Sequence, residues 1–248
     1  MRSPQLSLVR FMNKHDIYRI IRNELSRNFL IYKYFAERNG TPLLNDNTDL
    51  VIEGFPRSAN SFFEMALRAY LPKTLQFAHH CHARAHVEEA VRRGIPCIVL
   101  IRNPIDAIVS YLEESGKLSS PAVLFREYII FYEDIERLYP GIMLISFDTV
   151  KTNPAHAIAH VARTMSLHVN SDDLEKIDVD DLLDQVAEIA RERVGITPAY
   201  RRKAEGGAGG TDREVLRATL RENAMRAAPA FLRRRALWLF SRLKEHAF

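Results

Sequence analysis

Residues 50–67 read LVIEGFPRSANSFFEMAL, and this stretch decides the expected fold. It opens with the apolar run 50–52, passes through a polar turn at 54–61 and ends in the apolar stretch 62–67. That order predicts a buried strand, a turn and a helix, which is half of a βαβ unit.

The same change from strand to helix recurs further along the chain. Residues 97–101, CIVLI, are a β-branched apolar run, and Asn103 and Pro104 then suit the N-cap and the first position of a helix. Residues 142–145 predict a third strand, and residues 154–165 predict the helix after it. Strands that alternate with helices indicate the α/β class, with a parallel β-sheet flanked by helices.

The chain of 248 residues is expected to form one domain, because a core of this size fits a single compact unit. Residues 1–47 are its helical N-terminal segment, in which residues 15–37 carry the apolar stripe of one amphipathic helix. Residues 48–170 are the α/β core. Residues 171–248 are a helical C-terminal part with a glycine-rich loop at 204–210.

The composition, with 47% hydrophobic and 27% charged residues, excludes wholesale disorder. Two cysteines, Cys81 and Cys97, and a start without a signal-peptide pattern favour a reducing compartment. Every apolar run is far shorter than the roughly 18–20 residues of a membrane span. We therefore expect a cytoplasmic protein, either free or peripheral to a membrane.

The net charge of +4 is unevenly distributed. Residues 170–190 hold eight acidic residues against Lys176, whereas residues 191–248 hold fourteen lysines and arginines against six acidic residues. Such a basic region suits an anionic ligand or lipid surface, and no nucleic-acid module accompanies it. Two interpretations of the apolar, basic C-terminal helix stay open: packing on the core with its arginines outward, or peripheral contact with a membrane.

The polar turn at 54–61 has the chemistry of an anion site. Arg57 supplies a permanent charge and a bidentate fork, and Ser58, Asn60 and Ser61 supply donors beside the N–H groups of the helix that follows. We expect a phosphate or sulfate cradle. It is not a Walker P-loop, because the second glycine and the lysine of G-x-x-x-x-G-K-[ST] are absent, and ATP hydrolysis is therefore disfavoured.

A second anion site is expected after the strand at 97–101. Arg102 leaves the end of that strand, and Ser110 follows eight residues later on the predicted helix. Because the carboxyl ends of parallel strands bind ligands, two such turns imply one ligand with two separated phosphates.

Together the two turns resemble those of the sulfotransferases that use 3′-phosphoadenosine 5′-phosphosulfate (PAPS). Residues 54–61 resemble the family's 5′-phosphosulfate loop, and residues 102–110 its 3′-phosphate motif. Residues 146–154 are similar to a further family segment, and residues 200–203 weakly resemble its basic lid. The resemblance, which covers about 49–205, implies a P-loop-NTPase-like three-layer sandwich. It also implies transfer of a sulfuryl group from PAPS to a hydroxyl or amine of an acceptor, without a metal.

The resemblance also assigns roles. Arg57 would be catalytic by holding the sulfuryl and bridging oxygens, the loop would surround the 5′-phosphate, and Arg102 with Ser110 would hold the 3′-phosphate. The product would be adenosine 3′,5′-bisphosphate. The implied PAPS-binding residues are Pro56, Arg57, Ser58, Ala59, Asn60, Ser61, Arg102, Ser110, Arg201, Arg202 and Lys203.

The general base is assigned to His82. The family often places its base in a "K-T-H" after a strand, and here a strand is expected near 74–77, ahead of His82. An imidazole can accept the proton of an acceptor at neutral pH. Glu64 and Glu113 are the alternatives if a carboxylate serves instead, as branches that act on carbohydrates imply.

Two loop residues depart from the family pattern. Many members carry lysine where Arg57 stands, and arginine stabilises charge but does not readily donate a proton. Ala59 replaces the usual glycine, so a positive φ there would cost about 1 kcal/mol.

Other functions compete with this one. His82 and His86, with Cys81 adjacent, would form a zinc-type pair if their segment were helical, but no third ligand group is evident and no metal is expected. A small-molecule kinase would need ATP and Mg²⁺. A non-catalytic descendant would bind a nucleotide or a membrane and transfer nothing. For a sulfotransferase, a carbohydrate or lipid-linked glycan is the expected acceptor.

Overall fold

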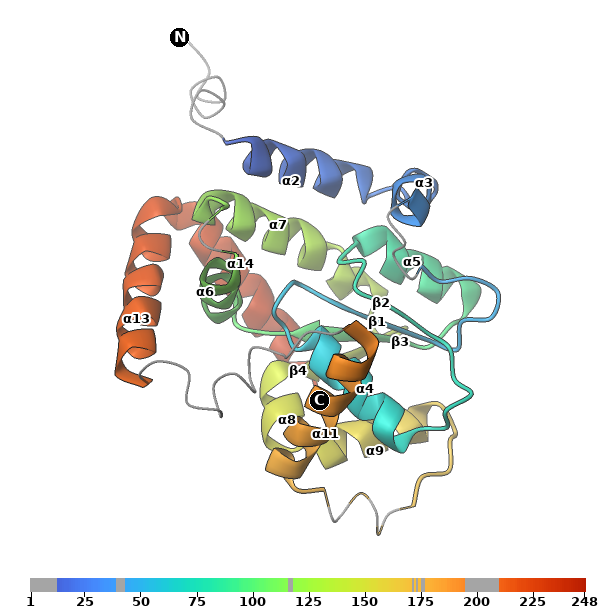
Figure 1. Ribbon diagram of the computed structural model, residues 1–248. Coiled ribbons are helices and arrows are strands. Elements are labelled where there is room, and N and C mark those ends of the chain that lie inside the picture. The colour runs from blue at the N-terminus through green and yellow to red at the C-terminus, as the bar shows by residue number, and fades with distance from the viewer. Residues whose placement is uncertain are drawn as a thin grey trace.

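The computed structural model describes residues 13–38, 43–115, 118–170, 172, 174, 177–194 and 210–248. Within these residues a four-stranded parallel sheet has the order β2-β1-β3-β4 (Figure 1). Its strands are β1 (Leu50–Gly54), β2 (Phe77–His79), β3 (Cys97–Ile101) and β4 (Met143–Ser146). The predicted α/β class, with its parallel sheet, is confirmed.

The strands are buried on both faces, and successive side chains alternate between two hydrophobic clusters. One cluster takes Val51 and Val99, and the other takes Ile52 and Ile98. The expected strand at 74–77 is displaced to β2, because Leu75 N–H donates to the carbonyl of Pro72 in a turn.

Helices cover both faces of the sheet (Figure 1). The first face carries α5 (Arg84–Arg93), α6 (Pro104–Glu114), α7 (Pro121–Glu133) and α14 (Ala230–Lys244). The second face carries α4 (Asn60–Tyr70), α9 (Pro154–Thr164) and α11 (Val179–Val194). The short α8 (Phe147–Thr152) follows β4, the 3₁₀-helix η2 (Ile135–Leu138) follows α7, and α13 (Gly210–Ala227) packs against α6. This is the expected three-layer arrangement.

The start of α6 agrees with the sequence prediction in detail. The Asn103 side chain accepts from the backbone N–H of Ile105, 3.0 Å away, and Pro104 is the first helical residue. This capped start fixes where the chain turns after β3.

The prediction of one helix over 15–37 is wrong. The chain forms α2 (Lys14–Leu25) and α3 (Phe29–Arg38), with a break at 26–28. Asn28 starts the second helix, because its side chain accepts from the N–H groups of Leu30 and Ile31. The Ser26 carbonyl accepts from Ala85 N–H, 3.3 Å away, which ties the break to the body of the protein.

The C-terminal helix α14 packs on the core. Ala236, Leu239 and Leu243 are buried, and Arg235 and Arg242 pair with acidic residues of α7 and η2. Of the glycine-rich loop at 204–210, only Gly210 lies within the described residues. Among the described helices, none is long and apolar enough to cross a bilayer.

Candidate functional site

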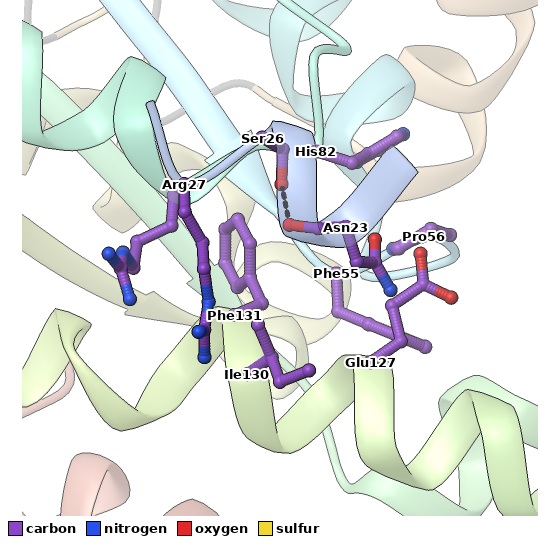
Figure 2. Close-up of a pocket in the computed structure, with 10 residues that line it drawn as sticks. Asn23, Ser26, Arg27, Phe55, Pro56, His82, Glu127, Ile130 and Phe131 are labelled. Carbon is purple, nitrogen blue, oxygen red and sulfur yellow. Dashed lines mark hydrogen bonds between the residues drawn. The ribbon is translucent and has the colours of Figure 1, made fainter. Parts of the chain in front are cut away.

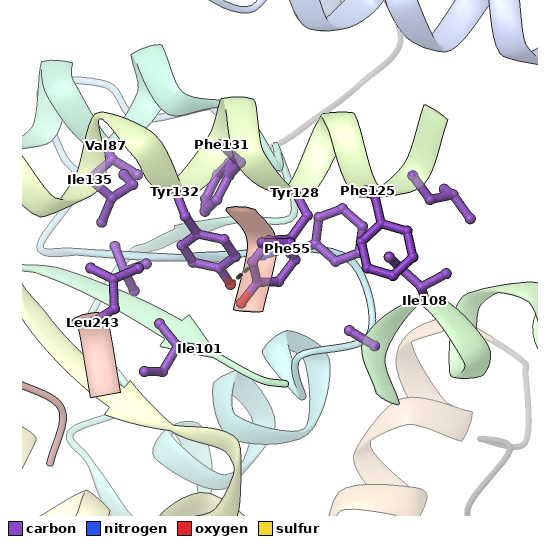
Figure 3. Packing of buried hydrophobic residues seen from close by; sticks show 14 of the residues in the cluster. Phe55, Val87, Ile101, Ile108, Phe125, Tyr128, Phe131, Tyr132, Ile135 and Leu243 are labelled. Atoms are coloured by element: carbon purple, nitrogen blue, oxygen red, sulfur yellow. Dashed lines mark hydrogen bonds between the residues drawn. The ribbon is translucent and has the colours of Figure 1, made fainter. Parts of the chain in front are cut away.

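The two predicted anion turns lie side by side, at the carboxyl ends of β1 and β3. These strands are neighbours, with Gly54 opposite Leu100. The hydroxyl of Tyr132 bridges them: it accepts from Phe55 N–H at 3.0 Å and donates to the carbonyl of Leu100 at 2.6 Å. Tyr132 belongs to the aromatic cluster in Figure 3, where the rings of Phe55 and Tyr128 lie 5.2 Å apart. The two turns are therefore mounted on one rigid support.

The first turn contains two left-handed L-residues. Arg57 has φ 70° and Ala59 has φ 74°. Ala59 is the N-cap of α4, and its methyl group caps no N–H. The first-turn N–H groups of α4 are thus left to other acceptors, and an anion at a helix N-terminus is one. Each left-handed residue costs about 1 kcal/mol, and strain of this kind concentrates at functional sites.

The junction between β1 and this turn requires glycine. A Cβ on Gly54 would lie 2.6 Å from Asn60 Oδ1 and 2.7 Å from the carbonyl oxygen of Leu100. Asn60 Nδ2 donates to the carbonyls of Gly54 and Phe55, each at 3.3 Å. The structure therefore places Asn60 inside the loop, where it closes the junction.

Buried polar atoms in both turns lack hydrogen-bond partners among the described residues. These atoms are Ser58 Oγ, Asn60 Oδ1 and Arg102 Nε. Leaving such groups unsatisfied costs about 1–3 kcal/mol each, so a polar ligand that reached Ser58 or Arg102 would recover part of that cost.

The Arg57 side chain reaches across to the second turn. Its Nε donates to Ser110 Oγ at 3.3 Å, and its Nη2 lies 3.8 Å from Glu114 Oε2. Sequence reasoning expected Arg57 and Ser110 to serve separate anions. In the structure they are in contact, so both turns belong to one site.

Arg102 lies between the turns. Its Nη1 donates to the carbonyl of Arg57 at 2.6 Å, and its guanidinium carbon stands 3.9 Å over the ring of Phe147. Burial, opposed by the negative charge of Asp106 and assisted by the positive charges of Arg217 and Arg57, lowers the pKa of Arg102 to about 10. Arg102 stays protonated at neutral pH, and an anion between these arginines would relieve their mutual repulsion.

The predicted base His82 lies beside the first turn. Its Nδ1–H donates to the carbonyl of Gly54 at 2.7 Å, which leaves the Nε2 lone pair as the basic site. Burial lowers the pKa of His82, so the ring is neutral at pH 7. His82 and Pro56 line the same small pocket (Figure 2), together with Asn23 and Glu127. The turn after β1 and the predicted base are therefore close neighbours.

The two alternative carboxylates are held in ion pairs. Glu64 is buried and pairs with Arg68, while His79 Nε2 lies 3.7 Å from it. Glu113 pairs with Arg213. Burial raises the pKa of Glu113, but the hydrogen bond from Arg213 and the nearby positive charges of the arginines together outweigh burial, so the net pKa is lowered.

Sequence reasoning missed His80 and Glu53. His80 Nε2 shares a hydrogen bond of 2.6 Å with Ser61 Oγ, so this histidine touches the cradle. Glu53, buried in β1, accepts from the N–H groups of Cys81 at 2.9 Å and His82 at 2.8 Å. The sequence did contain a signal for Glu53, because a charged residue inside an otherwise apolar strand indicates a buried polar role.

The zinc interpretation fails on geometry. Helix α5 begins at Arg84, so His82 and His86 do not share a helix. The described residues do bring Glu53, Cys81 and His86 within 4.8 Å, all buried. However, His86 Nε2 accepts from Leu44 N–H at 2.9 Å, its Nδ1–H donates to Glu53 at 2.9 Å, and burial raises the pKa of the Cys81 thiol. These donor atoms are already used, so the cluster fits an internal hydrogen-bond network.

The remaining predicted ligands, Arg201, Arg202 and Lys203, lie outside the described residues.

No protein-family model matches the chain, and no curated protein matches it. Among solved structures, it is similar to the crystal structure of mouse sulfotransferase SULT7A1 complexed with PAP. The TM-score is 0.45 at 13% sequence identity, and the match covers 84% of this chain and 92% of the mouse chain.

Proposed function

We propose that this protein is a PAPS-dependent sulfotransferase, which transfers the sulfuryl group of PAPS to an acceptor and releases adenosine 3′,5′-bisphosphate. The observation that carries the proposal is the meeting of Arg57, Arg102 and Ser110 at the ends of two adjacent strands. A bisphosphorylated nucleotide has the two anionic groups that this arrangement suits.

Arg57 and the N-terminus of α4 would hold the phosphosulfate end of PAPS, with Ser61 beside them. Arg102 and Ser110 would hold the 3′-phosphate. On binding, Arg57 would exchange its contact with Ser110 for an anionic ligand, because an anion adds Coulomb attraction that a neutral hydroxyl does not provide. Its permanent charge stabilises negative charge that develops on the transferred group, and it gives up no proton.

His82 is proposed as the general base. Its Nε2 would accept the proton of the acceptor hydroxyl or amine, while the bond from Nδ1–H to Gly54 holds the ring in the basic tautomer. A carbohydrate or a lipid-linked glycan is the proposed acceptor class, and the cytoplasm the proposed location.

Calorimetric titration with adenosine 3′,5′-bisphosphate tests the proposal, beside AMP and beside ATP with Mg²⁺. We expect micromolar affinity, about −8 kcal/mol, for the bisphosphate and much weaker binding of AMP. Radiolabelled PAPS with a panel of acceptors then tests turnover. A preference for ATP with Mg²⁺ would point to a kinase instead, and binding without turnover on any acceptor would point to a non-catalytic protein.

A further inference from the structure

Helix α2 turns a polar face toward the rest of the protein and an apolar face outward, which is the reverse of an ordinary surface helix. Its buried residues are polar: Asp16, Arg19 and Asn23. Its large apolar side chains point outward, with Ile17 44%, Tyr18 62% and Ile21 53% exposed. An amphipathic helix on a globular protein normally turns its apolar stripe to the core.

Specific polar contacts fix this orientation. Arg19 Nε donates to Glu127 Oε2 at 2.8 Å, and Asp16 Oδ1 accepts from Ser120 N–H at 2.9 Å. Arg22 also pairs with Glu127, at 3.1 Å. Turning the apolar stripe inward would break these contacts and leave the buried carboxylate of Glu127 without the arginines that neutralise it. The outward stripe is therefore built into the packing of α2 on α7.

Helix α3 continues the pattern. Tyr32 and Ala36 are buried, while Leu30 is 76% exposed, Ile31 43% and Tyr34 54%. Both helices lie at the outer edge of the molecule, on the far side of α7 and α5 from the sheet (Figure 1). Of the twelve exposed large hydrophobic residues in the described chain, six are on these two helices. We name the set the outer apolar face: Ile17, Tyr18, Ile21, Leu30, Ile31 and Tyr34.

The charge around the outer apolar face is positive. Lys14 on α2, Lys33 on α3 and Arg27 in the break between the two helices are exposed. Arg27 and Lys33 pair with the exposed Glu24 and Glu37, and Lys14, Arg22 and Arg38 add further positive charge to these helices. In residues 1–23 the single acidic residue is Asp16, which is buried on the inner side of α2. Residues 1–12, which precede α2 in the sequence, add two arginines, six residues of the Leu, Val, Phe and Met types, and no acidic residue.

We infer that the outer apolar face docks on the surface of an anionic lipid bilayer. Apolar side chains at the headgroup boundary, tyrosines at the interface and nearby lysine and arginine side chains are the recognised composition of an interfacial helix. A second copy of the chain fits less well, because a two-fold contact through this face would set two surfaces of the same positive net charge against each other. The inference is independent of the proposed sulfuryl transfer.

Co-sedimentation with vesicles tests it, using phosphatidylcholine alone or phosphatidylcholine mixed with phosphatidylserine. The full chain is expected to bind the mixed vesicles and to be released by high salt. The variant Ile17→Ser/Ile21→Ser/Leu30→Ser, which alters exposed side chains only, is expected to lose binding by about tenfold or more.

The matched control is Val215→Ser/Phe231→Ser/Trp238→Ser, which alters three equally exposed apolar residues of α13 and α14. It should bind the mixed vesicles as the unaltered chain does. Loss of binding in the control alone would move the contact to the C-terminal helix and overturn the inference. The inference would also be overturned if the unaltered chain bound neither kind of vesicle. It would be overturned as well if light scattering showed a dimer that the first variant dissociates. Circular dichroism confirms that each variant is folded.

Discussion

Arg102 donates a hydrogen bond from Nη1 to the backbone carbonyl oxygen of Arg57, 2.6 Å away. The side chain that leaves β3 therefore holds the main chain of the turn after β1 at a residue with φ 70°. Any change at Arg102 therefore acts on both turns at once.

Arg102→Ala is expected to weaken binding of adenosine 3′,5′-bisphosphate by about a hundredfold. The variant loses the positive charge that contacts the phosphate and also loses the hydrogen bond that supports the loop at Arg57. Arg102→Lys keeps a donor for the Arg57 carbonyl but loses the planar fork, so its affinity should fall in between. Calorimetry measures both. Arg234→Ala, which removes an exposed arginine of α14, should bind normally; equal affinity in all three variants would contradict the assigned site.

Ala59→Gly is expected to stabilise the protein. Ala59 has φ 74°, and relief of that strain, about 1–2 kcal/mol, outweighs the added entropy of glycine in the unfolded chain, about 0.4–1 kcal/mol. The free energy of unfolding in urea should rise by about 0.5 kcal/mol. Ala69→Gly, on an exposed position of the same helix, should instead lower it by about 1 kcal/mol. Changes of the same sign in both variants would rule out strain at residue 59.

His82→Asn is expected to reduce turnover by about 10²–10⁴-fold and to leave bisphosphate affinity unchanged. Because burial lowers the pKa of His82, the base protonates only below its ordinary pKa of 6.5, so kcat/KM should stay level near neutrality and fall at more acidic pH. His80→Asn provides the comparison, since it removes the contact with Ser61. If His80→Asn abolishes turnover and His82→Asn does not, the base is misassigned.

Stability should fall with acid partly through His79. Burial lowers the pKa of this ring from 6.5 to about 4 in the folded protein. Between those values the unfolded chain binds a proton that the folded chain does not, so the free energy of unfolding decreases as pH drops from 6.5 to 4. The loss should reach about 2–3 kcal/mol. Urea titrations of His79→Gln across this range should show a shallower dependence; a slope equal to that of the unaltered chain would exclude His79 as its source.

The core of the fold was predictable because its signals are local. The apolar run before Gly54 marks β1, and Asn103 with Pro104 marks the start of α6. Each signal concerns residues that are neighbours in the chain, where capping and strand burial act. The left-handed conformation of Ala59 was considered only as a condition, because the resemblance places a glycine at this position.

The rest depends on partners distant in sequence. The orientation of α2 is decided by Glu127, more than a hundred residues away from Arg19, and its own periodicity predicts the opposite face inward. The contact of Arg57 with Ser110 likewise requires the sheet to bring two turns together. His80 reaches Ser61 because β2 pairs beside β1, which no local pattern reveals.

The order β2-β1-β3-β4 has one further consequence. From β1 the chain crosses to β2 through α4, on the second face of the sheet. From β2 it passes back over β1 to β3 through α5, on the first face. The winding thus reverses direction at β1, and the gap between the ends of β1 and β3 is a topological switch point, where open parallel sheets part to form a crevice. The location of the candidate site is a property of the winding, and we expect the arginines at its rim to select the ligands of the crevice.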